Sequence, residues 1–311
     1  MKCAIVTGAN GFIGKAVCRK LLDERIKTYA IVRNSETMKE LQTDPNLIIV
    51  EGNLENILAL ETVLQGEAYD VFYHFAWSGT SGESLKNVSV QAENIIYTCN
   101  TLQLAVRLGC KKYIFAGTIN ELELMPFFEA QTFKPRAASI YGITKLTCDF
   151  ICKTIASDEQ LCYNTAIIGS CFGPGDRSWR IHNTFISNML EQKTPKLVSG
   201  DVWHDWVYID DVAGMFCALG KKSVNRKNYY IGHNSLRKLK DILYEVRDIL
   251  CPKLQLRFGD LKDTFQIDYS LVDLNAVCDD TGYECQTDFK TAILQTAKWV
   301  MEMKKAEEQM S

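Results

Sequence analysis

The chain has 311 residues, a formal net charge of −3 and a hydrophobic fraction of 47%, which is enough for one large domain or two ordinary ones with a sizeable core. Because no basic excess is present, the composition argues against a nucleic-acid partner, whose phosphates need a basic face. The N-terminus has no signal-peptide pattern, and no apolar run approaches the roughly 20 residues of a membrane span. We therefore expect a cytoplasmic protein that does not bind membranes.

Short apolar segments rich in β-branched residues alternate with amphipathic segments along the first half of the chain. The predicted strands cover residues 2–7, 27–32, 47–50, 70–75, 112–116 and 163–168. The predicted helices cover residues 12–23, 55–64, 85–108 and 141–156. This alternation predicts βαβ units, and the mostly apolar strands predict helices on both faces of the sheet. The predicted fold class is α/β, with a Rossmann-type doubly wound parallel sheet.

The second half of the chain has a looser pattern, which begins with the turn-rich segment CFGPGDRSW at 171–179. The elements predicted there are helices at 183–192, from Asp210, at about 236–250 and at 288–305, an extended stretch at 201–209 and a strand at 228–232. We expect a dinucleotide-binding domain over 1–168 and a smaller substrate-binding region over 169–311. Some of the later segments are expected to return to the main sheet.

The first predicted strand leads into the segment VTGANGFIG, which has glycines at 8, 11 and 14. Between a strand and a helix, the first glycine permits a tight turn, the second lets the backbone approach a pyrophosphate, and the third lets the helix pack closely on the strand. The helix N-terminus adds free N–H groups and the positive end of its dipole. We therefore predict a dinucleotide site rather than a purely structural turn. The predicted contacts are Gly8, Asn10, Gly11, Phe12, Ile13 and Gly14.

The residue after the second predicted strand bears on the choice of cofactor. A carboxylate there would bond the ribose hydroxyls of NAD, but this chain has Arg33, whose planar guanidinium can grip a 2′-phosphate. We therefore predict NADP(H), with NAD as the alternative if Arg33 is only an exposed strand-end residue. Asn53 and Leu54 follow the third strand and are also expected to contact the cofactor, Asn53 at the adenine edge.

The segment SIYGITK places Tyr141 and Lys145 four residues apart, on one face of a predicted helix. A free tyrosine, with a pKa near 10, is a poor acid–base catalyst at neutral pH, but a nearby ammonium favours the phenolate. Such a tyrosine can give a proton to a carbonyl oxygen or take one from an alcohol. Alone this spacing fits any amphipathic helix, but here it follows the fifth predicted strand, downstream of a nucleotide site.

Several motifs together resemble the extended short-chain dehydrogenase/reductase family, in its branch of NAD-dependent epimerases and dehydratases that act on sugar nucleotides. They are TGANGFIG at 7–14, GNL at 52–54, HFAW at 74–77, Asn94, Tyr141 with Lys145, FGPGD at 172–176 and HDWVYIDDVA at 204–213. The resemblance implies that Thr118 orients the substrate oxygen, that Tyr141 transfers the proton and that Lys145 also bonds the nicotinamide ribose. It further implies that the loop Ala76–Trp77–Ser78 lines the nicotinamide and substrate mouth.

Departures from the family pattern bear on the reaction. Family dehydratases carry Asp-Glu directly after the catalytic Thr, whereas this chain has Ile119 and Asn120. Sugar 4,6-dehydration is therefore not expected. Arg33 favours a one-way reductase that exchanges NADPH, acting on a keto group such as C4 of a nucleotide-linked deoxyhexulose. The alternatives are a nucleotide-sugar epimerase with bound NAD(P) and a non-catalytic dinucleotide-binding sensor. Glu121 and Glu123, further along the same segment, either contact the substrate or are solvated, and solvation is the expected outcome.

The substrate contacts are less well defined by the motifs. His204 stands where the family often has an arginine that grips the diphosphate, and it is expected to be a weaker, pH-dependent cation. Ser170 replaces a family asparagine, and Arg177 and Arg180 are either diphosphate contacts or solvated loop charges. Ser78 completes the predicted substrate set. The resemblance implies a homodimer in which the helices at 85–108 and 141–156 pair with those of a second subunit.

Twelve cysteines are scattered along the chain and form no C-x-x-C pair. Cys148 and Cys152 are four residues apart on a predicted helix, a spacing that can hold a metal. No second pair or histidine cluster completes four ligands. We therefore expect free thiols in a reducing compartment and no metal site.

Overall fold

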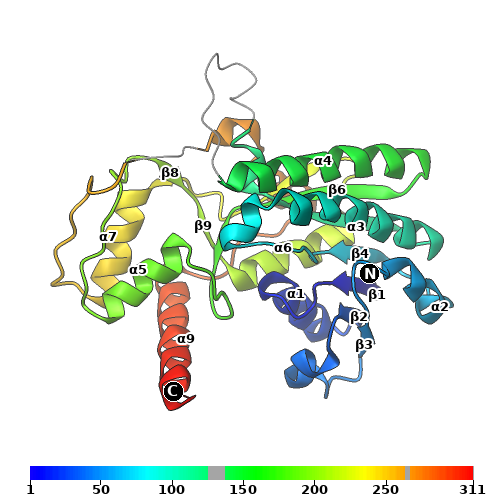
Figure 1. Cartoon of the computed structure of the whole chain (residues 1–311), viewed down its shortest axis with the longest axis horizontal. Coiled ribbons are helices and arrows are strands. Elements are labelled where there is room, and N and C mark those ends of the chain that lie inside the picture. Colours follow the sequence, from blue (N-terminus) through cyan, green and yellow to red (C-terminus); the bar gives the residue numbers. More distant parts are fainter. Residues whose placement is uncertain (125–136, 263–266, 311) are drawn as a thin grey trace. The chain divides into compact units, whose positions relative to one another are not determined.

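The computed structural model describes residues 1–124, 137–262 and 267–310 (Figure 1). These residues form two compact units. The first unit comprises Met1–Ile168, Val212–Ile231 and Asp268–Glu284. The second unit comprises Gly169–Asp211, Gly232–Ile267 and Cys285–Ser311. Three separate stretches of the chain therefore build each unit.

The first unit is built on a seven-stranded sheet in the order β10-β6-β5-β4-β1-β2-β3. Every paired neighbour in it is parallel. The strands are β1 (Cys3–Thr7), β2 (Lys27–Val32), β3 (Leu47–Glu51), β4 (Val71–His74), β5 (Lys112–Thr118), β6 (Cys162–Ile168) and β10 (Asn228–Ile231). The strand order reverses between β1 and β4, and a crevice for ligands forms at such a reversal in open α/β sheets.

The central strands are buried because helices cover the sheet. Each residue of β1, β4 and β5 is buried, as expected for a parallel sheet with both faces covered. The aromatic rings of Phe72, Tyr113 and Tyr163 stack in a row across β4, β5 and β6, with centroid separations of 5.4 and 5.9 Å. Their apolar packing fixes the register of the strands whose ends carry the predicted site.

The helices of the first unit begin and end close to the predicted boundaries, with three differences. The helices are α1 (Phe12–Asp23), α2 (Glu61–Leu64), α3 (Val88–Arg107), α4 (Ala137–Asp158), α6 (Ile209–Lys222) and α8 (Ala276–Thr281). The helix predicted over 55–64 is divided equally between the 3₁₀ helix η2 (Ile57–Leu60) and the short helix α2, and the buried Ile57 and Leu60 of η2 have the three-residue spacing of a 3₁₀ helix. The helix predicted from 85 begins instead at Val88, after the 3₁₀ helix η3 (Gly82–Lys86). The helix predicted from 141 begins at Ala137, so Tyr141 lies in its second turn.

Short elements that the sequence analysis did not predict complete the first unit. They are the 3₁₀ helices η1 (Ser35–Leu41), η4 (Ile119–Glu121) and η6 (Tyr269–Leu271), together with α8. Each is seven residues or shorter, which is too short for a hydrophobic period to be recognised.

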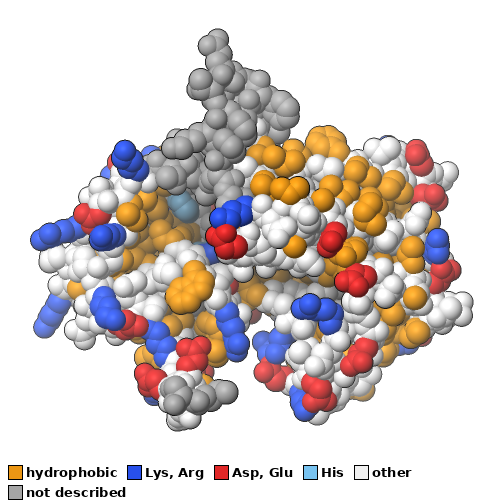
Figure 2. Space-filling model, viewed as in Figure 1, with side chains coloured by type: hydrophobic (Ala, Val, Ile, Leu, Met, Phe, Trp, Pro, Cys, Tyr) orange, Lys and Arg blue, Asp and Glu red, His pale blue; other side chains and the backbone are white. Residues whose placement is uncertain are grey.

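Helices α3 and α4 pack side by side on one face of the sheet (Figure 1). Several of their large apolar side chains are nevertheless exposed, namely Val88, Ile96, Ile143 and Phe150. Hydrophobic side chains gather over these two helices in the space-filling view (Figure 2). Among the described residues, none of the helices has the length and apolarity needed to cross a bilayer.

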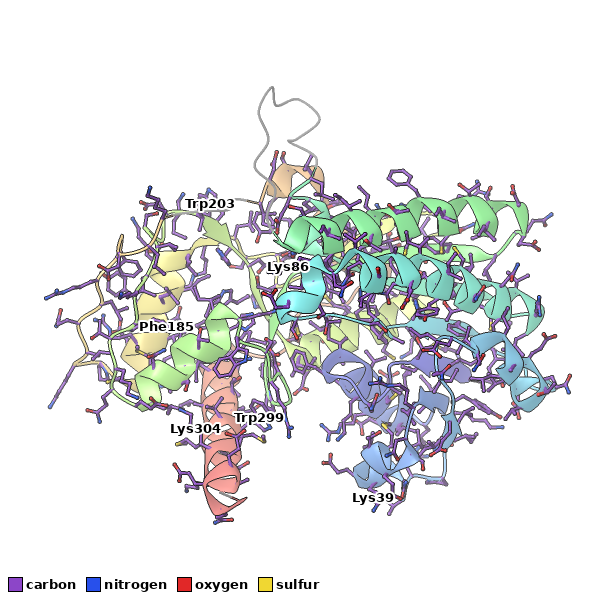
Figure 3. All side chains as sticks on the ribbon, in the orientation of Figure 1. Lys39, Lys86, Phe185, Trp203, Trp299 and Lys304 are labelled. Carbon is purple, nitrogen blue, oxygen red and sulfur yellow. The ribbon has the colours of Figure 1, made fainter. Side chains whose placement is uncertain are left out.

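Over its described residues, the second unit contains two two-stranded sheets and three α-helices. Its elements are β7 (Ser170–Phe172), α5 (Ile181–Leu190), β8 (Trp203–His204), β9 (Trp206–Tyr208), β11 (Arg237–Lys238), α7 (Leu239–Leu250) and α9 (Phe289–Met310). The extended stretch predicted at 201–209 contains β8 and β9, while β7 lies partly in the segment predicted as turns. Helix α9 lies against α5, where Lys304 donates a hydrogen bond of 2.6 Å to Ser187 and Phe185 is buried (Figure 3).

Candidate active site

The glycine loop after β1 has the close packing that its sequence predicts. Gly8 has a φ of +66°, and a Cβ on it would lie 2.7 Å from the backbone nitrogen of Ala76. A Cβ on Gly14 would lie 2.2 Å from the carbonyl oxygen of Gly8. Larger residues at these two positions would force the loop away from β4 and from helix α1, so the tight turn depends on both glycines.

Helix α1 begins directly after this loop, with Gly11 as its N-cap residue. Because Gly11 has no side chain, it cannot cap the first-turn N–H groups, which include those of Phe12 and Ile13. Gly11 and Asn10 are both exposed. An uncapped helix N-terminus beside an exposed glycine suits the pyrophosphate of a dinucleotide, so the loop fits the predicted cofactor.

Arg33 and Glu51 lie at or beside the ends of the neighbouring strands β2 and β3, where the far end of the dinucleotide site is predicted. Arg33 follows β2, is exposed and has no ion-pair partner among the described residues. Glu51 ends the neighbouring strand β3 and accepts a hydrogen bond of 2.8 Å from the backbone N–H of Ser35. Hydrogen bonding from Ser35 lowers the pKa of Glu51, which keeps this carboxyl ionised. Asn53 lies just beyond Glu51 and is exposed, and Leu54 is partly buried.

Lys145 is held in an aromatic cage at the end of β5. Its Nζ lies 3.7 Å from the ring centre of Trp77 and 4.7 Å from that of Phe115, and it donates a hydrogen bond of 2.7 Å to the carbonyl oxygen of Ala116. The side chain is 3% exposed, and burial lowers the pKa of Lys145 to about 8. The aromatic faces stabilise the charged form and oppose this lowering.

Tyr141 lies one turn before Lys145 on α4. The Nζ of Lys145 is 5.9 Å from the ring centre of Tyr141, and the ring of Trp77 meets that of Tyr141 edge-on at 5.8 Å. Thr118 ends β5 and is 9% exposed. The structure therefore brings together Trp77, Tyr141 and Lys145, with Ala116 linking Lys145 to the strand that ends in Thr118.

The loop that carries Trp77 is tied to α3 by two buried amides. Trp77 donates a hydrogen bond of 3.0 Å from Nε1 to Gln91, which in turn donates to the carbonyl oxygens of Gly79 and Ser84. The Asn94 side chain accepts from the Ser78 N–H at 2.8 Å and donates to the Ser78 carbonyl at 2.9 Å. These bonds fix the backbone beside the predicted nicotinamide pocket. Asn94 belongs to the motifs that the sequence shares with the family, whereas none of those motifs includes Gln91.

The burial of Glu121 contradicts the prediction that this side chain is solvated. It was expected to be solvated, and so was Glu123, but the two side chains are only 3% and 6% exposed. The Oε1 atom of Glu121 accepts a hydrogen bond of 2.7 Å from the backbone N–H of Thr118, and burial raises the pKa of Glu121 to about 8. The error arose because a loop carboxylate is normally exposed, whereas this one folds back to cap η4.

His74 ends β4 and is buried between two hydroxyl groups. Its Nδ1 lies 2.8 Å from the Oγ1 of Thr7, and its Nε2 lies 3.3 Å from the Oγ1 of Thr98. Thr7 also accepts a 3.3 Å hydrogen bond from the N–H of Ala76. Burial lowers the pKa of His74 to about 3, so the ring is neutral at pH 7. His74 therefore links the ends of β1 and β4, where the glycine loop begins.

The predicted substrate residues other than Ser78 lie in the second unit. Ser170 pairs with Trp206 between β7 and β9, and Arg180 is the exposed N-cap residue of α5. Arg177 is also exposed, and its guanidinium lies 3.7 Å from the sulfur of Met303. His204 is partly buried, and burial lowers its pKa to about 4. The cation expected at His204 is therefore uncharged at pH 7, because the ring is shielded from solvent.

A model of the NAD dependent epimerase/dehydratase family matches residues 4–232, which include the glycine loop, Thr118, Tyr141 and Lys145. The chain belongs to this family. The match confirms the resemblance found in the sequence motifs, and the protein is an enzyme of the NAD-dependent oxidoreductase and epimerase class. The predicted α/β fold class is likewise confirmed by the parallel seven-stranded sheet.

Relatives within this family act on different nucleotide sugars, as their names state. The chain is 25% identical over 271 residues to an uncharacterised UDP-glucose epimerase, YtcB, of Bacillus subtilis, covering 82% of this chain and 84% of that protein. It is 26% identical over 265 residues to the CDP-abequose synthase of Salmonella typhimurium, covering 80% and 81%. It is 23% identical over 270 residues to the dTDP-4-dehydro-6-deoxyglucose reductase of Escherichia coli, covering 82% and 84%.

Solved structures share the fold at low sequence identity. The dTDP-glucose 4,6-dehydratase DesIV of Streptomyces venezuelae, solved as a double mutant with NAD bound, superposes with a TM-score of 0.80 at 21% identity, covering 100% of each chain. The UDP-glucose 4-epimerase of Thermotoga maritima, solved with UDP-glucose, superposes with a TM-score of 0.77 at 20% identity, covering 97% of this chain and 99% of that chain. At these identities the likeness shows the fold, and the reaction has to be argued from the site residues.

Proposed function

We propose that the protein is an NADP(H)-dependent reductase of a keto group, at C4 of a nucleotide-linked deoxyhexulose. The observation that carries this proposal is the grouping of Tyr141 and Lys145 around Trp77 beside the end of β5, with Ile119 and Asn120 in place of a dehydratase acid pair. The grouping supports proton transfer to a carbonyl oxygen. The two substitutions at 119 and 120 argue against elimination of a hydroxyl.

Each predicted catalytic group has a distinct task. When bound, NADPH would supply the hydride that the carbonyl carbon accepts. Tyr141 donates its phenolic proton to the carbonyl oxygen as negative charge develops there, and the ammonium of Lys145 stabilises the resulting phenolate. The hydroxyl of Thr118 donates a hydrogen bond to the same oxygen and so orients the substrate. Lys145 also bonds the nicotinamide ribose in this proposal, which couples cofactor position to proton transfer.

The cofactor preference is proposed from the charge at the end of β2. The exposed guanidinium of Arg33 is available to bind a 2′-phosphate, whereas a carboxylate at that place would repel it. Gly8, Gly11 and Gly14 together with the N-terminus of α1 would hold the pyrophosphate. A reductase has to exchange its cofactor after each turnover, and the open position of Arg33 is compatible with such exchange.

A nucleotide-sugar epimerase is the second candidate, because the chain is similar in sequence to the UDP-glucose epimerase YtcB. An epimerase oxidises and then reduces the same carbon, and it uses the same Tyr and Lys. It needs no net supply of NADPH. The two candidates therefore differ in cofactor handling rather than in the residues that touch the reacting carbon.

The test incubates the purified protein with NADPH or NADH and a panel of UDP-, dTDP-, CDP- and GDP-linked 4-keto-6-deoxyhexoses. A reductase consumes stoichiometric NADPH and prefers it to NADH. Protein that is purified with tightly bound NAD, and that interconverts 4-hydroxy sugars without consuming NADPH, would establish the epimerase instead. Binding of NADPH without turnover of any sugar would support the sensor.

A further inference from the structure

A buried carboxyl group stands behind the end of β5, in a segment where a solvated side chain was expected. The Oε1 atom of Glu121 accepts the N–H of Thr118 at 2.7 Å, while the Oγ1 of Thr118 accepts the N–H of Asn120 at 3.4 Å. Together these bonds form a reciprocal capping box around η4. The backbone of Thr118 and its hydroxyl are therefore both restrained by this turn.

The last residues of β5 are held from two directions. Lys145 donates a hydrogen bond of 2.7 Å to the carbonyl oxygen of Ala116, and Glu121 accepts from the N–H of Thr118, also at 2.7 Å. Losing this buried hydrogen bond would leave the backbone donor of Thr118 without its partner, which costs more than the bond itself contributes. The position of Thr118 relative to the helix that carries Lys145 therefore depends on both contacts.

Gly117 leaves the space that the Glu121 carboxyl group occupies. A Cβ on Gly117 would lie 2.9 Å from the Oε1 of Glu121 and 2.9 Å from the Cγ2 of Thr165. Contacts this short require one of the neighbours to move. Any side chain at position 117 would thus displace the carboxyl group, so a second, independent residue controls whether Glu121 reaches Thr118.

Charged groups on α4 surround the same carboxyl. Lys145, Asp149 and Lys153 all act electrostatically on Glu121, with Asp149 opposing its ionisation and the two lysines favouring it. Lys153 is paired with Asp149 at 2.6 Å. Glu121 is thus part of the charge environment of Lys145, although its own hydrogen bond is directed to Thr118.

We propose that Glu121 is a positioning residue, which fixes the hydroxyl of Thr118 for the carbonyl oxygen of the substrate by holding the Thr118 backbone. This role rests on the proposed function, because it requires Thr118 to act on a substrate oxygen. It predicts that the hydrogen bond, rather than the negative charge, is the essential property. Glutamine retains an oxygen that can accept the Thr118 N–H, whereas leucine fills a similar volume and cannot.

The experiment compares wild type, Glu121→Gln and Glu121→Leu, with Glu123→Gln as a control at a similarly buried carboxyl. For each protein, kcat and KM are measured with whichever 4-keto sugar of the panel supports turnover, the Kd for NADPH is measured by fluorescence, and hydrogen exchange of the Thr118 amide is followed. E121L is expected to lose roughly 10- to 100-fold in kcat, as for misplacement of a reacting group by about 1 Å. Its Kd for NADPH is expected to remain within about threefold of wild type, because the pyrophosphate site lies at the glycine loop.

Rescue by glutamine separates positioning from general stability. E121Q is expected to retain kcat within about threefold and to keep the Thr118 amide protected, while exchange of that amide accelerates in E121L. The positioning role would be overturned if the kcat of E121L equals that of wild type. It would also be overturned if the kcat of E121Q is as low as that of E121L. If the wild-type chain reduces no sugar of the panel, the proposed function fails and the role fails with it.

A second variant covers the case in which E121L does not fold. Gly117→Ala keeps the Glu121 carboxyl but forces it away from Thr118, so kcat is expected to fall while the Kd for NADPH is unchanged. Full activity in G117A, together with unchanged protection of the Thr118 amide, would also overturn the proposal.

Discussion

Replacing Arg33 with Asp should reverse the cofactor preference. A hydrogen bond to a charged group contributes about 1.5–3 kcal/mol, and because Arg33 is exposed we take the lower end for the lost contact with a 2′-phosphate. The new carboxylate would repel that phosphate by about 1–4 kcal/mol at a separation of about 4 Å. At the lower limits these terms sum to about 2.5 kcal/mol, and 1.4 kcal/mol is tenfold, so we expect a decrease of roughly 60-fold or more in the preference for NADPH.

The assay is the ratio of kcat/KM for NADPH to that for NADH, supported by the Kd of each cofactor from fluorescence titration. Glu51→Gln is the matched control, since it removes a carboxylate at the end of the neighbouring strand β3 and should change the ratio in the opposite direction. Raised salt should weaken the effect, because the charges involved are exposed. A ratio that changes by less than about threefold in Arg33→Asp would refute the assignment of Arg33 to the 2′-phosphate.

Three further predictions address the proton donor, the buried histidine and the exposed helices. Tyr141→Phe should lower kcat by at least about 100-fold with nearly unchanged NADPH binding, and a smaller loss would contradict its role as proton donor. Since burial lowers the pKa of His74 to about 3, unfolding takes up a proton at this residue below pH 6.5. The free energy of unfolding should therefore fall on acidification by up to about 1.4 kcal/mol per pH unit. Urea denaturation at several pH values should show that this fall is shallower in His74→Asn than in wild type. Equal pH dependence of the two proteins would refute the linkage. The exposed apolar residues of α3 and α4 are the predicted homodimer interface. The double variant Ile96→Lys with Phe150→Lys should therefore be a monomer by light scattering, while the wild-type protein is a dimer. A monomeric wild-type protein would exclude this dimer.

Much of the first unit could be predicted from the sequence, because parallel strands have a strong local signal. The strands predicted at 27–32 and 163–168 differ from the observed ones by one residue at most. A buried parallel strand is apolar throughout, so its ends coincide with the first polar or turn-forming residues. The same rule fails in the second unit, where β8 and β11 are only two residues long and their pairing joins distant parts of the chain. No local pattern specifies such a pairing.

The candidate site also has some contacts that could be predicted from the sequence and others that could not. Tyr141 and Lys145 share a helix face, so their proximity follows from a spacing of four residues. The position of Trp77 over Lys145 instead depends on the amides of Gln91 and Asn94, which hold the loop after β4. Those contacts join residues 14 to 16 positions apart through an irregular loop, and hydrophobic periodicity contains no information about them.

Glu121 differs from these cases, because the sequence did contain its signal. Thr118-Ile119-Asn120-Glu121 has the spacing of a capping box, in which a Thr at the N-cap and a Glu three residues later bond each other's backbone. A capping box usually precedes a long apolar helix, whereas here it closes a single 3₁₀ turn, so the usual context of the motif is missing. A motif that orders one turn at the end of a central strand fixes the strand's last side chain. In this protein that side chain is Thr118, so the local rule that sets the geometry of η4 also sets the position of the hydroxyl that we propose orients the substrate.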